Sequence, residues 1–218
     1  MQPLDPYDVD AYREMLTERI IGGDLEQLSA PIEIRDYDAR WPERYASEAE
    51  RIRSALGERV LRLEHAGSTS VPGLPAKPII DIVLEVHDSR NEDEYVPDLE
   101  AADYILRARE PDWFEHRGFK SADKGVNLHV SSAGCAETER MVAFRNHLRL
   151  EAADRELYAR VKRELATHPW TYMQQYADAK TAVVAEIMSR ALAAVPQQRK
   201  RREPLPLPPS SRNRRLGD

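Results

Sequence analysis

The sequence has a single cysteine and no long apolar stretch, and each absence excludes a class of protein. Among its 218 residues Cys135 is the only cysteine, which rules out an internal disulfide and a zinc site built from cysteines. No apolar run approaches the roughly 18 residues that span a bilayer. The first residues, MQPLDPYDVD, lack the basic and apolar regions of a signal peptide. We therefore expect a cytoplasmic protein with no membrane partner.

What the sequence does contain is enough apolar material for a core and two regions of opposite charge. Hydrophobic residues make up 41% of the chain, and the formal net charge is −6. Residues 196–218 hold seven basic residues, two acidic residues and five prolines, whereas residues 1–195 hold 25 basic and 36 acidic residues. An acidic body is not expected to bind nucleic acid. The basic tail is expected to be disordered, either simply solvated or acting as a weak phosphate-binding or proline-motif arm.

Hydrophobic periodicity divides the chain into an N-terminal helical extension at 1–30, a domain at 31–195 and the tail at 196–218. The expected strands are 60–67, 77–86, 104–110, 113–120 and 126–132, with a further strand-like run at 32–37. The expected helices are 41–56, 95–102, 137–149, 152–167 and 170–194. Strands thus fill the first half and helices the second. This order predicts an α+β fold with a mixed sheet, rather than a doubly wound βαβ series.

The segment HAGSTSVPGLPAKPIID, residues 65–81, joins two expected strands and concentrates the groups that an anion site needs. Glycine permits positive φ or close backbone approach, and backbone N–H groups with hydroxyls surround anions in such loops. The lysine supplies a cation. The candidate phosphate-binding residues of the loop are Gly67, Ser68, Thr69, Ser70 and Lys77.

Asp81 stands inside the apolar strand that follows this loop, where a carboxylate is costly unless it is paired or holds a metal. A phosphate-contacting loop followed by a strand carboxylate is what a magnesium–nucleotide site requires. The spacing excludes a Walker A loop, which needs a GxxxxGK[ST] pattern that opens a helix. The alternative is an ordinary turn followed by a strand with one capping aspartate.

The segment HAGSTSVPGLPAKPIIDI resembles the signature of the GrpB-like family, within the nucleotidyltransferase superfamily. The resemblance continues in NLHV (127–130), FRNHLR (144–149), YARVKREL (158–165) and YADAKT (176–181), and so covers about residues 31–195. It implies a nucleotidyltransferase-like core in which a Gly-Ser turn joins two strands, the second bearing Asp-x-[Asp/Glu]. In that superfamily, carboxylates hold two Mg²⁺ ions while a nucleotidyl group moves from an NTP to an acceptor.

The sequence matches this pattern at Gly67, Ser68 and Asp81 but departs from it at the second acid. Val83 stands two residues after Asp81, where the superfamily has a carboxylate. Glu85 lies on the same face of the strand, about 6–7 Å beyond Asp81. It is expected either to contribute to the metal site or to face solvent.

The remaining candidate residues each have a functional and a structural interpretation. The third carboxylate position is taken by Asn127 and His129, so His129 is either a metal ligand and general base or a packed histidine. Lys180 lies within the apolar stripe of the last helix, where it either faces a bound anion or extends to solvent. The YADAKT resemblance favours the anion. Arg145 is expected either to bind a phosphate or to form a surface ion pair.

These observations predict a nucleotidyltransferase-like enzyme that binds an NTP with Mg²⁺ and transfers a nucleotidyl group to, or adenylates, a small-molecule acceptor. Asp81 and His129 would be catalytic, and Asp81, Glu85 and His129 would hold the metal. One alternative is a nucleotide or phosphometabolite binding module with reduced catalysis, and another is an interaction protein with a vestigial cleft. The number of acids that meet at Asp81 separates the first two readings.

Overall fold

The structure is a computed structural model that describes residues 4–21, 25 and 27–201. These residues form seven α-helices and a five-stranded sheet. The strands are β1 (Arg62–Ala66), β2 (Ile80–Val86), β3 (Tyr104–Glu110), β4 (His116–Ser121) and β5 (Val126–Ser132). The helices are α1 (Val9–Arg19), α2 (Trp41–Leu56), α3 (Val96–Ala101), α4 (Ala136–Leu150), α5 (Ala152–Ala166), α6 (Met173–Ala179) and α7 (Thr181–Arg201).

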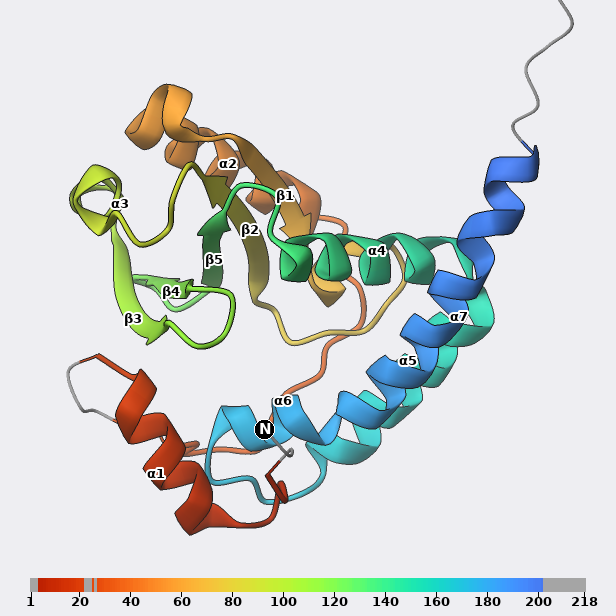
Figure 1. Cartoon of the computed structure of the whole chain (residues 1–218). Coiled ribbons are helices and arrows are strands. Elements are labelled where there is room, and N and C mark those ends of the chain that lie inside the picture. The colour runs from red at the N-terminus through yellow and green to blue at the C-terminus, as the bar shows by residue number, and fades with distance from the viewer. Residues whose placement is uncertain (1–3, 22–24, 26, 202–218) are drawn as a thin grey trace, which may run out of the picture.

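The sheet is mixed, as the order of strands and helices predicts. Its strand order is β1-β2-β5-β4-β3, with β2 and β5 parallel and every other pair antiparallel. β2 therefore lies inside the sheet, which agrees with its nearly continuous apolar sequence. Helices α2 and α3 lie on one side of this sheet, and α5, α6 and α7 form the helical C-terminal half (Figure 1). The α+β fold is confirmed.

The two faces of the sheet differ because side chains alternate along each strand. One face carries Ile80, Ile82 and Leu84 of β2, which are fully buried and belong to the main core with α2 and α3. The opposite face carries polar residues, and the β2–β5 register sets Asp81 beside Asn127. One face of the sheet therefore packs into the main core, and the other presents polar side chains that are available for binding or catalysis.

The C-terminal half differs from the expected single helix at 170–194. The chain breaks at Lys180, whose backbone N–H bonds to the carbonyl of Ala177, three residues back instead of four. The last helix, α7, then continues to Arg201, beyond the expected helix end at 194. The rest of the tail, 202–218, lies outside the described residues.

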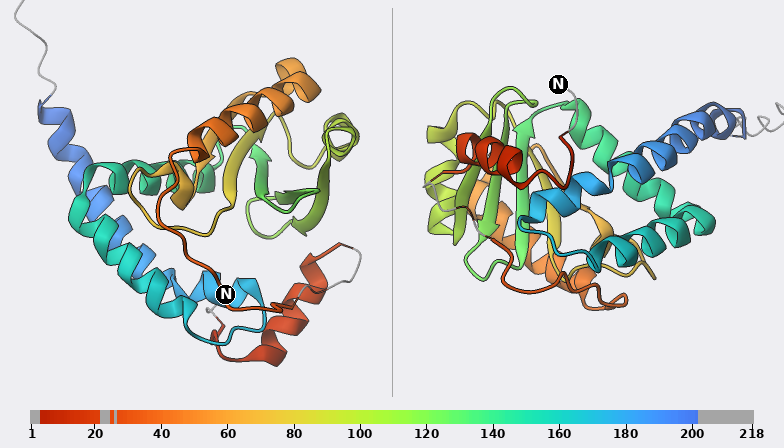
Figure 2. Two further views of the ribbon diagram at one scale, coloured as in Figure 1. Left: turned by 180° about the vertical axis from the view of Figure 1, so that it is seen from behind. Right: turned by 90° about the horizontal axis from the view of Figure 1, so that it is seen from below.

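The N-terminal residues pack against the C-terminal half and the far edge of the sheet. The hydroxyl of Tyr12 on α1 donates to Asp178 on α6, at 2.7 Å, and the backbone of Leu28 bonds to Thr171. Seen from below, α1 crosses the sheet (Figure 2). The strand-like run at 32–37 forms an isolated bridge, Arg35 with Ala76, since two hydrogen bonds join these residues and no ladder follows. Within the described ranges, no helix is both long enough and apolar enough to cross a membrane.

Candidate functional site

A cavity of about 720 Å³ lies between the polar face of the sheet and the layer formed by α1, α6 and the segment that follows α1. Asp81, Asn127 and His129 line it from the sheet. The loop between β1 and β2, which holds the expected phosphate-binding residues, forms one of its borders. The structure therefore brings the loop and the strand carboxylate to one cavity, as the sequence predicts.

Gly67 and Asp81 are in direct contact at the start of this loop. Gly67 has φ 65° and ψ −173°, a backbone conformation open to glycine almost alone. A Cβ atom at this position would lie 2.2 Å from Oδ2 of Asp81, which only glycine avoids. The other oxygen, Oδ1, accepts a hydrogen bond from the Asn127 side-chain amide at 2.9 Å. The carboxylate is thus held from both sides.

The three hydroxyls of the loop do not all serve the cavity. Ser68 Oγ accepts a hydrogen bond from the ammonium of Lys162 at 3.0 Å and lines the cavity. The Thr69 hydroxyl bonds to the carbonyl of Ile79, and that of Ser70 donates to the carbonyl of Gly67. The hydroxyls of Thr69 and Ser70 are therefore bonded within the loop, although Thr69 also lines the cavity, and Ser68 is the loop hydroxyl that contacts a lysine there.

Lys162, on α5, is the cation that the sequence did not single out. Its side chain is buried, and its ammonium donates to Ser68 and to the carbonyl of Pro75 and lies 4.8 Å from the centre of the Tyr158 ring. Burial, and next the charge of Lys180, lower the pKa of Lys162 to about 7. An ammonium in this position is costly without an anion.

Lys77 and Lys180 share the ring of Tyr176 inside the same cavity. The ammonium of Lys180 lies 4.5 Å from the ring centre and that of Lys77 lies 5.5 Å from it. Burial, and next the charge of Lys77, lower the pKa of Lys180 to about 8, and burial lowers the pKa of Lys77. The hydroxyl of Tyr176 is buried with no hydrogen-bond partner among the described residues. The Tyr176 hydroxyl is therefore an unpaired hydrogen-bond donor close to two ammonium groups.

Three ammonium groups, those of Lys77, Lys162 and Lys180, therefore lie in the part of the cavity where the charge of one carboxylate, Asp81, acts on all of them. We call Lys77, Asp81, Lys162 and Lys180 the lysine end of the polar face. Among the residues that the structure describes, none of these lysines forms an ion pair with a carboxylate within 4.0 Å. The lysine end carries an excess of buried positive charge, which is the electrostatic requirement of an anion site.

Two expected site residues lie elsewhere, in a group that we call the arginine end of the polar face. It consists of Arg62, Glu64, Glu85 and Arg145. Arg145 donates to Glu64 at 2.9 Å and to the carbonyl of His65 at 2.8 Å, which occupies its guanidinium. Glu85 is buried, and its nearest cation is Arg62 at 3.8 Å. Neither Glu85 nor Arg145 lines the cavity.

Val83 is the physical reason for this separation. It stands between Asp81 and Glu85 on the same face, and it packs with Ala66 beneath Val142 of α4. Helix α4 therefore covers Val83, and Glu85 beyond it is buried, while Asp81 lines the cavity. The described residues contain no group of three His, Cys, Asp or Glu side chains that could hold a metal. The expected three-ligand site of Asp81, Glu85 and His129 is not assembled.

His129 lines the cavity and is held by His116 of β4, whose Nε2 lies 3.0 Å from Nδ1 of His129. Burial, and next the neighbouring His116, lower the pKa of His129 to about 4, so its imidazole is neutral near pH 7. His116 in turn contacts Glu110 of β3 at 2.8 Å. His116 was not a candidate in the sequence, since only the β4–β5 pairing brings it to His129.

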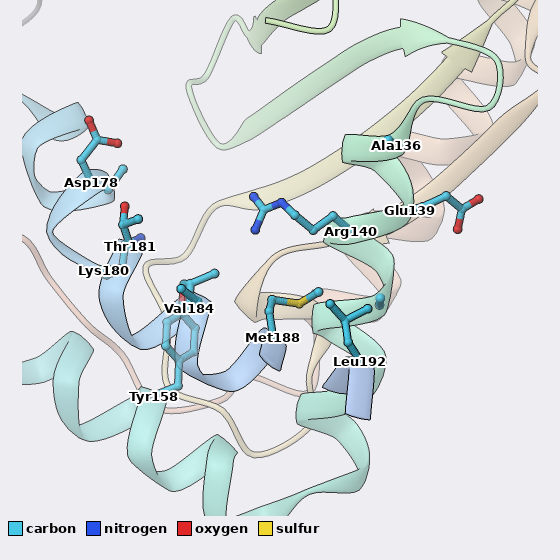
Figure 3. Close-up of a pocket in the computed structure, with 13 residues that line it drawn as sticks. Ala136, Glu139, Arg140, Tyr158, Asp178, Lys180, Thr181, Val184, Met188 and Leu192 are labelled. Carbon is cyan, nitrogen blue, oxygen red and sulfur yellow. The ribbon is translucent and has the colours of Figure 1, made fainter. Parts of the chain in front are cut away.

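A second cavity, of about 750 Å³, opens between α4 and the α6–α7 turn (Figure 3). Lys180 and Tyr158 line both cavities, so the lysine end forms the boundary between them. In Figure 3 the Arg140 side chain extends from α4 toward Thr181 and Lys180. Its guanidinium is paired with Glu137.

Lys162 could have been found in the sequence by the reasoning that found Lys180. Tyr158, Lys162 and Ala166 are spaced four residues apart, so they share one face of α5. Tyr158 and Ala166 are apolar and buried, and Lys162 lies between them. For both Lys162 and Lys180, the signal is a lysine inside the apolar stripe of a helix expected from the sequence.

Comparison with known proteins places the chain in a family. The family model described as GrpB protein matches residues 31–190. A UPF0157 protein of Halalkalibacterium halodurans, BH1888, is 56% identical over 81% of this chain and 90% of its own length. The crystal structure of the conserved protein GrpB from Enterococcus faecalis is 31% identical, with a TM-score of 0.65, covering 75% of this chain and 99% of that one.

A more distant relative has a longer chain. The dephospho-CoA kinase of Mycolicibacterium paratuberculosis is 31% identical over 62% of this chain, and the match spans 39% of the kinase. The resemblance read from residues 65–82 and the later motifs is thereby supported at the level of the family. The chain belongs to the GrpB (UPF0157) family.

Proposed function

We propose that this protein binds a small phosphorylated molecule, a nucleotide in the first instance, in the cavity of the lysine end. The observation that carries the proposal is the convergence of Lys77, Lys162 and Lys180, from three different segments, on the part of one cavity where Asp81 is the carboxylate. Buried ammonium groups are stable when an anion balances them, and phosphate groups carry the charge required. Ser68 supplies a hydroxyl at the same place. A nucleotide ligand agrees with the cytoplasmic location expected from the sequence.

Isothermal titration calorimetry tests this proposal. Wild-type protein is titrated with ATP, CTP, GTP and UTP, and with dephospho-CoA because of the name of the distant relative. Lys162→Met and Lys180→Met are each expected to lower the affinity about tenfold or more, the effect of losing a buried charge-assisted hydrogen bond. Arg160→Met, an exposed residue on the same helix α5, is the matched control and should leave the affinity unchanged.

Two outcomes would overturn the proposal. One is that no phosphorylated compound binds the wild-type protein at millimolar concentration. The other is that both lysine variants bind as tightly as the Arg160 control. Circular dichroism of each variant shows that the fold is retained.

Nucleotidyl transfer on a nucleotidyltransferase-like core is the second candidate, favoured by the contact between Gly67 and Asp81 on the loop and the strand. Two Mg²⁺ ions do not fit, since Asp81 belongs to no group of three His, Cys, Asp or Glu side chains that could hold a metal among the described residues. One Mg²⁺ fits, because this ion needs one or two carboxylates together with phosphate oxygens of the substrate. It would neutralise charge on the phosphates. Transfer would be supported if the wild type releases pyrophosphate from an NTP and Asp81→Asn does not. If the NTP binds but no pyrophosphate is released, the protein is a binding module.

A further inference from the structure

Three side chains on neighbouring strands form a hydrogen-bonded chain that ends in the cavity. Oε2 of Glu110 lies 2.8 Å from Nδ1 of His116, and Nε2 of His116 lies 3.0 Å from Nδ1 of His129. The other oxygen of Glu110 is paired with Arg19 of α1 at 2.9 Å. All four residues line the cavity. The chain thus runs from α1 across β3, β4 and β5 toward the lysine end.

The carboxylate determines where the protons of this chain lie. An ionised carboxylate only accepts hydrogen bonds, so Nδ1 of His116 must carry a proton. When His116 carries that one proton, its Nε2 is an acceptor, and Nδ1 of His129 must donate to it. A neutral His129 then has no proton on Nε2. One carboxylate therefore sets the tautomer of an imidazole two side chains away.

The surroundings favour this arrangement. Arg19 supports the negative charge of Glu110, and the pKa of Glu110 is lowered by its bonds to His116 and Arg19 in spite of burial. Trp113 packs edge-on against His116, with ring centres 5.2 Å apart, which fixes the plane of that ring. The charges of Asp81 on β2 and of Glu110 both act on His129. Glu110, His116 and His129 are therefore held as one unit.

We infer that Glu110 and His116 are positioning residues that present the unprotonated Nε2 of His129 to the cavity, where it accepts a hydrogen bond from a hydroxyl of the bound molecule. The inference rests on the proposed function for its ligand. The phosphate groups of that ligand lie at the lysine end, next to β2, and its hydroxyl-bearing part extends over β5 and β4. The ligand is thus a phosphorylated compound with free hydroxyl groups.

Nitrogen NMR of ¹⁵N-histidine-labelled protein at pH 8.5 tests the chain itself and needs no ligand. In the wild type, His129 should show a protonated Nδ1 and an unprotonated Nε2. In Glu110→Gln the amide is able to donate to His116 Nδ1, so the protonated and unprotonated nitrogens of His129 should exchange or mix. In His116→Ala the preference should be lost. Glu92→Gln, which removes a carboxylate paired with Arg109 and Arg117 on the same sheet, is the matched control.

Calorimetry tests the hydroxyl contact separately. His129→Leu should weaken ATP binding about fivefold, the value of one hydrogen bond, and should leave binding of inorganic triphosphate, which lacks hydroxyl-bearing carbon, unchanged. A protonated Nε2 of His129 in the wild type, or a tautomer that Glu110→Gln leaves unaltered, overturns the chain. If His129→Leu loses affinity equally for ATP and for inorganic triphosphate, the hydroxyl contact is overturned. If neither probe binds the wild type, the proposed function fails and the hydroxyl contact with it, while the nitrogen spectra still decide the chain.

Discussion

The lysine end and the arginine end lie on the same face of the sheet and are built from the same two kinds of charge. At the arginine end, both guanidinium groups have carboxylate partners within 4.0 Å: Glu64 for Arg145, and Glu64, Glu85 and also Glu139 of α4 for Arg62. At the lysine end, one carboxylate meets three ammonium groups beside an open cavity. The two groups differ in whether their cations have carboxylate partners and in whether they line the cavity. Paired charges away from the cavity stabilise the fold, whereas ammonium groups without a carboxylate partner beside the cavity are available to a ligand.

The largest effect is expected where the loop touches Asp81. Gly67→Ala places a methyl group against the Asp81 carboxylate and forces alanine into a conformation that glycine alone adopts readily. We expect a loss of roughly 2–5 kcal/mol in the free energy of unfolding, measured by urea denaturation. Gly73→Ala has positive φ but open space around the new methyl group, and should cost about 1–2 kcal/mol. Equal costs would show that Gly67 is needed for its backbone conformation alone.

Breaking the arginine end should reduce stability without touching ligand binding. Arg145→Met removes the hydrogen bonds to Glu64 and to the carbonyl of His65 at a buried position. The expected loss of unfolding free energy is about 2–3 kcal/mol, with the affinity for nucleoside triphosphates unchanged. Lys162→Met should instead lower the affinity for nucleoside triphosphates without reducing the free energy of unfolding. A fall in affinity in Arg145→Met would mean that the two ends are coupled through the loop.

The lysine end should make stability depend on pH in the alkaline range. Burial lowers the pKa of Lys162 to about 7 in the folded protein, against its ordinary 10.5 in the unfolded chain. Between these values the unfolded chain binds more protons, so the free energy of unfolding rises with pH. We expect a gain of about 1–3 kcal/mol from pH 7 to pH 9.5. The gain should shrink in Lys162→Met and persist in Arg160→Met, as urea denaturation at both pH values will show.

The smallest effect is expected at the single carboxylate. Asp81→Asn removes the repulsion between this group and the phosphates, so metal-free ATP should bind about threefold to tenfold more tightly. Any gain in affinity on adding Mg²⁺ should disappear in the same variant. Glu64→Gln, at the arginine end, should change neither value. Weaker metal-free binding in Asp81→Asn would show that the carboxylate accepts a hydrogen bond from the ligand.

The sequence predicts the sheet well because its strands follow simple alternation, which local periodicity records. The same alternation assigns Glu85 to the face of Asp81, but it does not show that Val142 of a later helix covers that part of the face. Lys162 was missed because α5 is rich in exposed charged pairs, which draw attention away from the short apolar stripe of Tyr158 and Ala166 in which it lies. The break at Lys180 depends on one changed backbone hydrogen bond, which hydropathy does not register.

The contact of Tyr12 with Asp178 joins residues 166 positions apart and has a consequence for synthesis of the chain. All five strands precede residue 133, so the sheet is complete on a growing polypeptide well before α6 exists. Helix α1 is made before the strands, yet its partner on α6 is made after them. During translation the sheet face that lines the cavity is therefore present before α6, and a ligand that binds before release from the ribosome would meet a cavity that α6 does not yet border.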